Sequence, residues 1–291
     1  MTIHCLGSIN LDHVHRLPHF PEPGETLQDS GYAIGLGGKG TNQAIAAHRA
    51  GGDVRLIAAL GEDGGWARDR IAETGLSLAG IAQVEAATGH AVIYVDAAGE
   101  NQIVIHGGAN RAIPDAHIEA AIAAAAPGDW WLTQNETNGT IESTRAAKAR
   151  GLRTAHVCAP FDAAAAGAIL PHLDLLAVNE GEAAALAAHL GTTPEALPVP
   201  ALLMTLGARG ALWRAGGETV KVDAFATEVV DTTGAGDTFL GYALAGLDSG
   251  LPVSDALCRA SAAAAIAVSR PGAAEAIPAR ADVDTYLEDH P

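Results

Sequence analysis

Short apolar runs alternate with alanine-rich stretches along most of this chain, from about residue 37 onward. The apolar runs have the length of strands and include 54–59, 130–133, 173–178 and 201–205, whereas stretches such as 261–268 have the composition of helices. Strands that alternate with helices build parallel sheets with helices on both faces. We therefore predict an α/β fold with a doubly wound, mainly parallel sheet flanked by helices.

Two regions, 11–35 and 88–106, break this alternation with short strand patterns and no helix between them. In the run 88–95 both the odd and the even positions are mostly apolar. A small sheet with one face in water would carry polar residues at alternate positions, so both faces of this strand should be covered. We expect the two regions to form one small β-sheet lid on a single domain of residues 1–291. Alternatively, the strand belongs to the central sheet.

The composition limits the possible partners and locations. The formal net charge is −17 without any basic run, so we expect no nucleic acid and no anionic membrane surface as a partner. No apolar run is long enough to span a bilayer, and residues 1–7 lack the pattern of a secretory signal, so we expect a cytoplasmic protein. The three cysteines and the twelve scattered histidines show no metal-ligand spacing, and we predict structural roles for them.

The most specific motif is Asp-Thr-Thr-Gly-Ala-Gly-Asp-Thr-Phe at residues 231–239, which leads into an apolar helical run. Small residues at a helix N-terminus, here Gly234, Ala235 and Gly236, leave backbone N–H groups free to bind an anion such as a phosphoryl group under transfer. Asp237 at the edge of this turn can accept a proton from a hydroxyl group. The alternative is the ordinary acidic first turn of a helix.

A second candidate site follows the first predicted strand, where Asn10 and Asp12 stand two residues apart. Alternate residues of an extended chain point to the same side. A carboxylate next to an amide suits the adjacent hydroxyl groups of a sugar, because the carboxylate accepts and the amide both donates and accepts. The alternative is an Asx turn at the end of the strand.

The run Gly-Leu-Gly-Gly-Lys-Gly-Thr-Asn-Gln at residues 35–43 contains the pattern G-x-G-x-x-G. A dinucleotide site is poorly supported, since the glycines do not follow the first strand of a compact βαβ unit. A P-loop is excluded because Lys39 is followed by Gly40 and not by Ser or Thr. We infer that the backbone closely approaches a ligand here, and that Lys39 and Asn42 reach it from the start of a helix.

Two further segments follow predicted strands and fit a nucleotide site, although each alone could be a loop or a helix cap. Asn179 opens the run Asn-Glu-Gly-Glu, where we expect Glu182 to hold a magnesium ion through water. Thr205 opens the run Thr-Leu-Gly-Ala-Arg-Gly, where Arg209 can contact phosphate. The predicted ATP-binding residues are Asn179, Thr205, Gly207, Arg209, Gly210 and Gly236.

In their order and spacing these motifs resemble those of the PfkB family of carbohydrate kinases, over nearly the whole chain. The resemblance implies transfer of the γ-phosphoryl group of ATP to a primary hydroxyl group of a pentose, D-ribose first, with Asp237 as the catalytic base. The sugar contacts that it implies are Asn10, Asp12, Gly38, Lys39, Asn42 and Glu136. Other sugars or a nucleoside remain alternative substrates. From other classes, a nucleotide-dependent oxidoreductase and a catalytically silent sugar-binding regulator remain open.

The resemblance also implies ATP with Mg²⁺, and a monovalent-cation site for K⁺. The cation-site residues are Asp231, Thr233, Ala267, Arg270, Gly272 and Ala276, which would contribute mostly backbone carbonyl groups. Position 276 is Ala where the family commonly has Ser, so one side-chain oxygen is missing.

We predict a homodimer because the expected lid has two apolar faces. If one lid face closes over the sugar, the other must be hidden from water, and a second lid can cover it across a two-fold axis. On the predicted strand, Val92 and Tyr94 would lie on one face, with Ala91, Ile93 and Val95 on the other.

Overall fold

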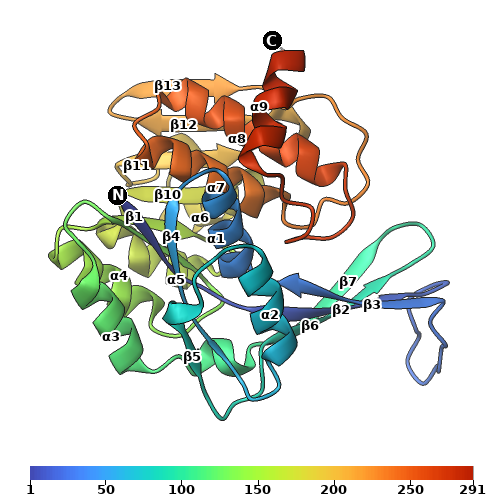
Figure 1. Cartoon of the computed structure of the whole chain (residues 1–291). Helices are drawn as coiled ribbons and strands as arrows, with labels where there is room; N and C mark the ends of the chain where they lie inside the picture. Colours follow the sequence, from blue (N-terminus) through green and yellow to red (C-terminus); the bar gives the residue numbers. More distant parts are fainter. Residues whose placement is uncertain (291) are drawn as a thin grey trace.

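A nine-stranded sheet forms the body of the protein in a computed structural model, which describes residues 1–290 (Figure 1). The strand order is β13-β12-β11-β10-β9-β8-β1-β4-β5, and only β12 and β13 are antiparallel to their neighbours. The predicted mainly parallel sheet is therefore confirmed. The strands are β1 (Thr2–Leu6), β4 (Asp53–Leu60), β5 (Ile81–Gln83), β8 (Trp130–Gln134), β9 (Arg153–Val157), β10 (Leu175–Asn179), β11 (Ala201–Thr205), β12 (Ala211–Ala215) and β13 (Glu218–Val222).

Helices cover both faces of this sheet and enclose apolar clusters against it. One face carries α1 (Lys39–Arg49), α2 (Gly65–Glu73), α7 (Ala235–Asp248), α8 (Val253–Val268) and α9 (Arg280–Asp289). The other face carries α3 (Asp115–Ala124), α4 (Thr140–Ala149), α5 (Ala163–Ile169) and α6 (Glu180–Leu190). Short 3₁₀ helices are η1 (Leu78–Gly80), η2 (Gly108–Arg111), η3 (Leu170–His172), η4 (Pro194–Ala196) and η5 (Gly207–Arg209). Helix α1 packs against α7, and hydrogen bonds from Asn42 and Gln43 to Asp237 bring the N-termini of these two helices together.

Four further strands form a separate small sheet that projects from the body, at the right in Figure 1. They are β2 (Asn10–Arg16), β3 (Gly31–Gly37), β6 (His90–Val95) and β7 (Asn101–His106), in the order β3-β2-β6-β7. The lid predicted from 11–35 and 88–106 lies in this sheet, and the alternative that strand 88–95 joins the central sheet is wrong. That residues 1–291 make up a single domain stays a prediction.

The structure corrects some predicted boundaries. Asn10 and Asp12 do not end the first strand but begin β2, because the chain leaves the central sheet through residues 7–9. The strand predicted at 173–178 begins at Leu175, since Leu173 still closes the turn after η3 through its N–H group. The helix predicted at 261–268 begins earlier, at Val253.

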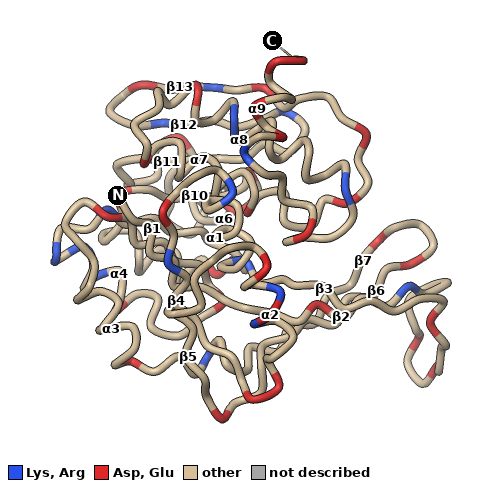
Figure 2. Tube along the Cα trace, in the orientation of Figure 1, with Lys and Arg blue, Asp and Glu red and all other residues tan. Residues whose placement is uncertain are grey.

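Acidic residues are spread over the body and the lid, with lysines and arginines interspersed (Figure 2). Within residues 1–290, no helix is both long enough and apolar enough to cross a membrane. Two of the three cysteines, Cys5 and Cys158, are buried, and Cys258 is partly buried.

Candidate active site

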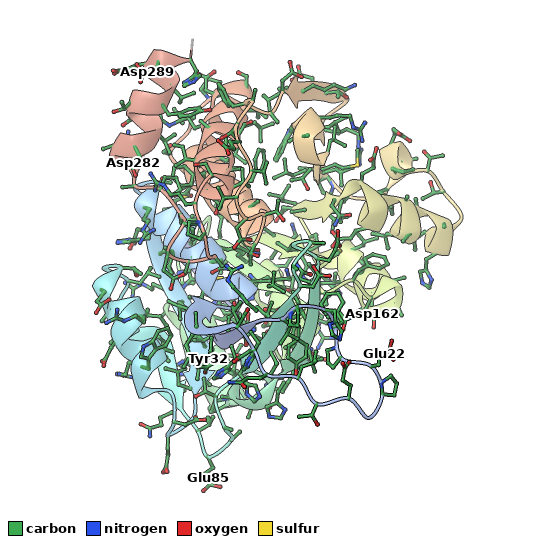
Figure 3. All side chains as sticks on the ribbon, turned by 90° about the vertical axis from the view of Figure 1, so that its right-hand side faces the viewer. Glu22, Tyr32, Glu85, Asp162, Asp282 and Asp289 are labelled. Carbon is green, nitrogen blue, oxygen red and sulfur yellow. The ribbon has the colours of Figure 1, made fainter. Side chains whose placement is uncertain are left out.

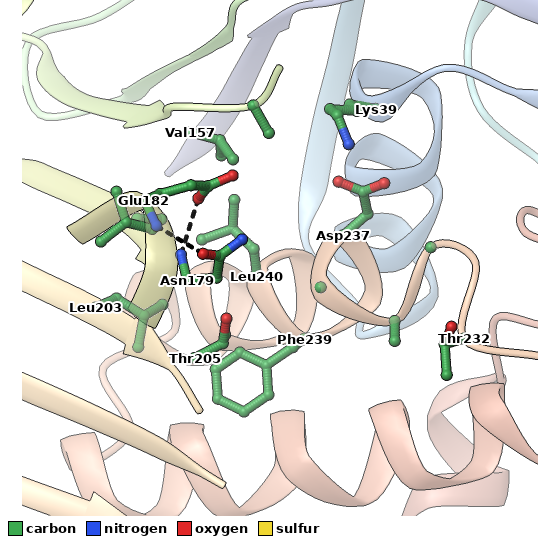
Figure 4. A pocket seen from close by; sticks show the side chains of 16 residues that line it. Lys39, Val157, Asn179, Glu182, Leu203, Thr205, Thr232, Asp237, Phe239 and Leu240 are labelled. Atoms are coloured by element: carbon green, nitrogen blue, oxygen red, sulfur yellow. Dashed lines mark hydrogen bonds between the residues drawn. The ribbon is translucent and has the colours of Figure 1, made fainter. Parts of the chain in front are cut away.

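A pocket of about 250 Å³ lies at the carboxyl edge of the central sheet, where the N-termini of α1 and α7 meet (Figure 4). Asn179 and Thr205, the last residues of β10 and β11, line it together with Lys39 of α1 and Asp237 of α7. Parallel α/β sheets bind ligands at this edge. Segments from the start, the middle and the end of the chain thus surround one cavity.

The first turn of α7 presents free N–H groups to this pocket. Its N-cap residue, Gly234, has a φ of 73°, which favours glycine, and no side chain caps the helix. Within residues 1–290, the N–H groups of Gly236 and Asp237 donate to no protein atom. A Cβ atom at Gly236 would meet no heavy atom within 4 Å. Free donors at the positive end of a helix dipole, next to open space, form an anion-binding site.

The carboxylate of Asp237 is buried and is held by α1. Its Oδ1 accepts a hydrogen bond from Nε2 of Gln43 at 2.7 Å, and its Oδ2 accepts one from Nδ2 of Asn42 at 3.2 Å. An ordinary acidic residue of a first turn caps its own helix or faces water. Asp237 does neither, because it is only 9% exposed and its partners belong to another helix. This geometry favours a proton acceptor over the alternative of an acidic helix turn.

Lys39 places a positive charge between the carboxylates of the site, and its amino group points toward Asp237 in Figure 4. The charge of Asp237 raises the pKa of Lys39 above its usual value, although burial lowers it, and Glu136 and Glu182 add to the rise. The ammonium group therefore stays charged in a largely buried position. A fixed cation here can stabilise negative charge on a transferred group.

Two glycines of the run at 35–43 are required by packing within the chain itself, and the predicted approach of this run to a ligand stays a prediction. A Cβ atom at Gly40 would lie 2.3 Å from Cα of Gly7, and one at Gly38, whose φ is 93°, would lie 2.6 Å from the carbonyl oxygen of Ser8. The N–H group of Thr41 donates to that same oxygen at 3.0 Å. These glycines let the start of α1 pack on the connection from β1 to β2, so the close approach is to the chain's own backbone.

Asp12 lies at the base of the lid, on the sheet face that carries its cross-strand neighbours Gly35 and Ala91. Burial, together with the charges of Glu136 and Glu275, raises the pKa of Asp12 to about 7, although the charge of Lys39 lowers it. The neighbouring Asn10 is buried, and its Oδ1 accepts from Nδ2 of Asn110 at 2.8 Å.

Glu136 lies just beyond β8 and is buried against the start of α1. Its Oε2 accepts hydrogen bonds from the backbone N–H of Lys39 at 3.0 Å and from the hydroxyl of Ser8. The structure thus brings Glu136 close to Lys39 and Asp12 in one group of polar side chains, although Lys39 lies 97 positions earlier in the chain and Asp12 lies earlier still.

The predicted nucleotide residues separate into two groups. Asn179 and Glu182 line the pocket and form a capping box at the start of α6: Oδ1 of Asn179 accepts from the N–H of Glu182, and Oε2 of Glu182 accepts from the N–H of Asn179, each at 2.8 Å. Arg209 is exposed and pairs with Glu180 at 2.5 Å. The residues outside the pocket lining are Gly207, Arg209 and Gly210, and their contact with ATP stays a prediction.

The predicted cation residues lie in the loop before α7, at the end of α8 and in the loop after α8, and hydrogen bonds tie these segments together. Oδ1 of Asp231 accepts from the N–H of Thr233 at 2.9 Å, and its Oδ2 accepts from the N–H of Gly272 at 3.0 Å. The N–H of Arg270 donates to the carbonyl of Ala267 at 3.0 Å. Ala276 is buried and brings no side-chain oxygen. Within residues 1–290, no cluster of three or more His, Cys, Asp or Glu side chains has the arrangement of a metal site.

Several residues that support the site were given no role in the analysis of the sequence. Gln43 holds Asp237, Ser8 holds Glu136, and Asn110 holds Asn10. The N–H of Leu36 donates to Oε1 of Glu275 at 3.2 Å, which places that carboxylate near the lid. Only Gln43 had a usable signal, because it lies four positions after Lys39 and hence on the same helix face.

Phosphoryl transfer to a hydroxyl group requires an anion site next to a proton acceptor, and the first turn of α7 provides both, so the fold and the site indicate a small-molecule kinase. The site-forming motifs come from the whole length of the chain. The chain belongs to the PfkB family: the profile described as "pfkB family carbohydrate kinase" matches residues 2–280. It is thus an ATP-dependent carbohydrate kinase by family, as the sequence motifs predicted.

Relatives and solved structures agree with this assignment over the full length. Ribokinase from Haemophilus influenzae is 34% identical over 302 residues, covering 99% of this chain and 98% of the relative. The structure of ribokinase from Cryptococcus neoformans in complex with ADP matches with a TM-score of 0.83 at 34% identity, covering 98% of both chains. Arabidopsis thaliana ribokinase complexed with ribose and ATP matches with a TM-score of 0.84 at 27% identity, covering 99% of this chain and 98% of that chain.

Proposed function

We propose that this chain is a ribokinase, which transfers the γ-phosphoryl group of ATP to the primary hydroxyl group of D-ribose and forms ribose 5-phosphate. The observation that carries this proposal is the position of Asp237, which lies between the free N–H groups of α7 and the polar group of Lys39, Glu136 and Asp12. Relatives named ribokinase at about one-third identity over the whole chain support the choice of sugar.

In the proposed reaction, the sugar hydroxyl oxygen attacks the γ-phosphorus while its proton passes to Oδ2 of Asp237. The bond between the γ-phosphorus and the bridging oxygen breaks, and ADP leaves with that electron pair. The N–H groups of Gly236 and Asp237 and the ammonium group of Lys39 stabilise the charge on the moving phosphoryl group. Asn10, Asp12, Gly38, Asn42 and Glu136 would orient the sugar.

Glu182 fits a magnesium role, because one of its carboxylate oxygens is held by the N–H of Asn179 while the side chain lines the pocket. It would hold Mg²⁺ through water, and the ion would neutralise phosphate charge. We also propose that Asp231, Thr233, Ala267, Arg270, Gly272 and Ala276 hold K⁺, mainly through carbonyl groups. The hydrogen bonds that join their loops support this. A cytoplasmic location stays a prediction.

A coupled assay of ADP release with a panel of sugars and nucleosides tests the function. We expect D-ribose to give the highest kcat/KM, above 2-deoxyribose, other pentoses, fructose and nucleosides. A site for a nucleoside base commonly has aromatic side chains that stack on the base. Both tyrosines of the lid, Tyr32 and Tyr94, are cross-strand neighbours of His15 on the face opposite Asp12, so they do not line the proposed sugar site. A higher kcat/KM for a nucleoside would refute the choice of ribose, and no ADP release with any acceptor would refute the kinase.

The two faces of the lid carry different side chains. Figure 3 shows the molecule from the side of the lid, with Tyr32 labelled. Four histidines that are scattered in the sequence lie together on the face opposite Asp12: His13, His15, His90 and His106. Hydrogen bonds satisfy part of this face: Nδ1 of His13 lies 2.7 Å from the hydroxyl of Tyr32. The Asp12 face is more apolar and carries Val14, Ala33, Ala91, Ile93, Val95, Ile103 and Ile105.

We propose that a homodimer forms through the Asp12 face of the lid, beyond the base of the lid where the sugar binds. Ile103 and Ile105 on this face are 49% and 47% exposed, and a sugar at Asp12 is too small to cover the whole face. Tyr32, Ile34 and Val104 are exposed on the opposite face, but the histidines beside them make that face compatible with water. The sequence suggested that ligand and partner use opposite faces. The side-chain distribution favours one shared face, with a two-fold axis joining two lids.

Adjacent residues of β7 provide a matched test of this dimer. Ile103→Asp puts a charge on the Asp12 face, whereas Val104→Asp puts the same charge on the histidine face, and both positions are exposed, so both variants should fold. By sedimentation velocity at micromolar concentration, we expect a dimer for the wild type and for Val104→Asp, and a monomer for Ile103→Asp. A monomeric wild type, or a dimer lost only in Val104→Asp, would overturn this arrangement.

Gly37→Ala tests how Asp12 is positioned. A Cβ atom at Gly37 would lie 2.0 Å from Oδ2 of Asp12, so the carboxylate must turn away. We expect KM for ribose to rise about tenfold, because misplaced binding groups lose most of their interaction. Gly35→Ala is the control: its Cβ atom would lie 3.9 Å from Cβ of Asp12, an ordinary contact, and KM should change less than about twofold. Equal KM values for the two variants would contradict the expected role of Asp12.

A further inference from the structure

Three buried side chains form a hydrogen-bonded row from β8 to Asp237. Gln134, the last residue of β8, donates from Nε2 to Oε1 of Gln43 at 2.7 Å, and Gln43 donates from Nε2 to Oδ1 of Asp237 at 2.7 Å. Both glutamines are fully buried. The row connects the central sheet, α1 and α7 directly behind the reacting oxygen, and the reaction described above uses neither glutamine.

The ionised carboxylate sets the direction of the whole row. A carboxylate only accepts hydrogen bonds, so Gln43 must turn its NH₂ group toward Asp237 and its oxygen toward Gln134. Gln134 must then donate from its own NH₂ group to the side-chain oxygen of Gln43. Consistent with this, Oε1 of Gln134 is buried without a hydrogen-bond partner among the described residues. Leaving a buried oxygen unpaired destabilises the fold, so the row costs stability that an apolar side chain would not cost.

The two oxygens of Asp237 are held differently. Oδ1 has the shorter contact, at 2.7 Å, to a side chain that lies wholly in the interior. Oδ2 has a longer contact, at 3.2 Å, to Nδ2 of Asn42. Asp237 lines the pocket, and its carboxylate lies next to the amino group of Lys39 on the same side of the pocket (Figure 4). A base works only when the accepting oxygen has a free lone pair directed at the hydroxyl group.

We propose that Gln43, itself fixed by Gln134, is a positioning residue for the catalytic base: it holds Oδ1 of Asp237 and so makes Oδ2 the oxygen that receives the sugar proton. This inference rests on the proposed kinase function. The glutamine amide fixes the rotation of the carboxylate, so that Oδ2 stays in line with the attacking hydroxyl when the phosphoryl group is transferred. Gln134 acts one step further away, because it blocks rotation of the Gln43 amide.

Gln43→Met tests the proposal, since Met fills a similar volume and cannot donate a hydrogen bond. We expect kcat with ribose to fall by about ten- to a hundredfold, as for other small misplacements of a catalytic group, while KM for ATP and for ribose changes less than about twofold. Gln134→Met leaves the Gln43–Asp237 contact in place and should lower kcat less than Gln43→Met does. A kcat for Gln43→Met within twofold of the wild type would overturn the proposal.

A double-mutant cycle separates positioning from general damage to the fold. If Gln43 acts only through Asp237, adding Gln43→Met to Asp237→Asn should lower the residual kcat no further, because the two changes remove one shared function. Melting temperatures of all variants control for folding. If Gln43→Met lowers kcat by the same factor in the Asp237→Asn background as in the wild type, Gln43 has a merely structural role.

Gln43→Glu provides a second readout that does not depend on Met packing. A carboxylate in contact with Asp237 favours the protonated form of the pair, so the acid limb of the kcat–pH profile should move to higher pH by at least about one unit. An unshifted acid limb would contradict the proposed contact. If the wild type phosphorylates no sugar, the proposed function fails first. An active wild type with normal Gln43 variants refutes only the positioning role.

Discussion

Replacing Asp237 by asparagine should lower kcat with ribose by at least about a hundredfold while KM for ATP stays nearly constant. General-base catalysis contributes about 10²- to 10⁴-fold, and the amide of Asn cannot take up the proton of the attacking hydroxyl. Asparagine has the same shape, and its side-chain oxygen can still accept the hydrogen bond from Nε2 of Gln43, so the packing between α1 and α7 should persist. The free N–H groups of the α7 turn remain, which explains why the nucleotide should still bind.

Steady-state kinetics with separate kcat and KM values measure this effect, and a circular dichroism spectrum with a melting curve controls for folding. Loss of kcat alone indicates an interaction made only in the transition state. Turnover of the Asp237→Asn variant within a few-fold of the wild type would remove Asp237 from the role of base. In that case the short contact from Gln43 would have to be explained as packing between two helices.

Much of the central sheet was predictable because its buried parallel strands have a local pattern. Strands buried on both faces are continuous apolar runs, and β11 occupies the predicted residues 201–205. The lid was also visible, since an apolar pattern on both faces of a short strand conflicts with a sheet half exposed to water. What could not be predicted was the point at which the chain leaves one sheet for the other. Residues 7–9 contain no proline and just one glycine, so Asn10 was assigned to the wrong element.

The site was predictable in so far as its residues lie in dense local motifs. Lys39 and Asp237 each stand at a helix start next to glycines, a pattern that indicates ligand binding before any partner is known. Contacts between distant segments have no such pattern. Asn110 supports Asn10 from a 3₁₀ helix beyond the lid, and Glu275 reaches Leu36 from the far end of the chain. Their roles depend on the tertiary fold alone.

The purpose of the 35–43 glycine run shows the limit of motif reasoning. A glycine predicts that something lies close to the backbone, but it does not identify what lies there. Here the close neighbour of Gly40 is Gly7 of the chain itself. Ligand contacts predicted from that run therefore need direct tests on the side chains of Lys39 and Asn42.

Replacing Asp12 by alanine should raise KM for ribose by about 10- to 150-fold, because the sugar hydroxyl groups lose a charged acceptor and are left unpaired. KM for ATP should barely change.

A loss of stability in the Asp12→Ala variant does not explain the expected rise of KM. Burial and the charges of Glu136 and Glu275 raise the pKa of Asp12 to about 7 in the folded protein. The native state thus binds this proton more tightly than the unfolded chain does. The contribution of Asp12 to stability declines as pH rises from about 4 to 7, and at pH 8 the variant should melt no lower than the wild type.

The raised pKa of Asp12 also gives ribose binding a pH dependence of known sign. Below about pH 7 Asp12 is protonated in the free site, whereas the bound sugar favours the carboxylate, which accepts stronger hydrogen bonds. The Kd for ribose, measured by calorimetry without ATP, should therefore rise several-fold between pH 8 and pH 6 in the wild type. Asp12→Asn cannot ionise, so its Kd should be higher than that of the wild type at pH 8 and flat over this range. Parallel pH curves for the two proteins would exclude Asp12 as the titrating sugar contact.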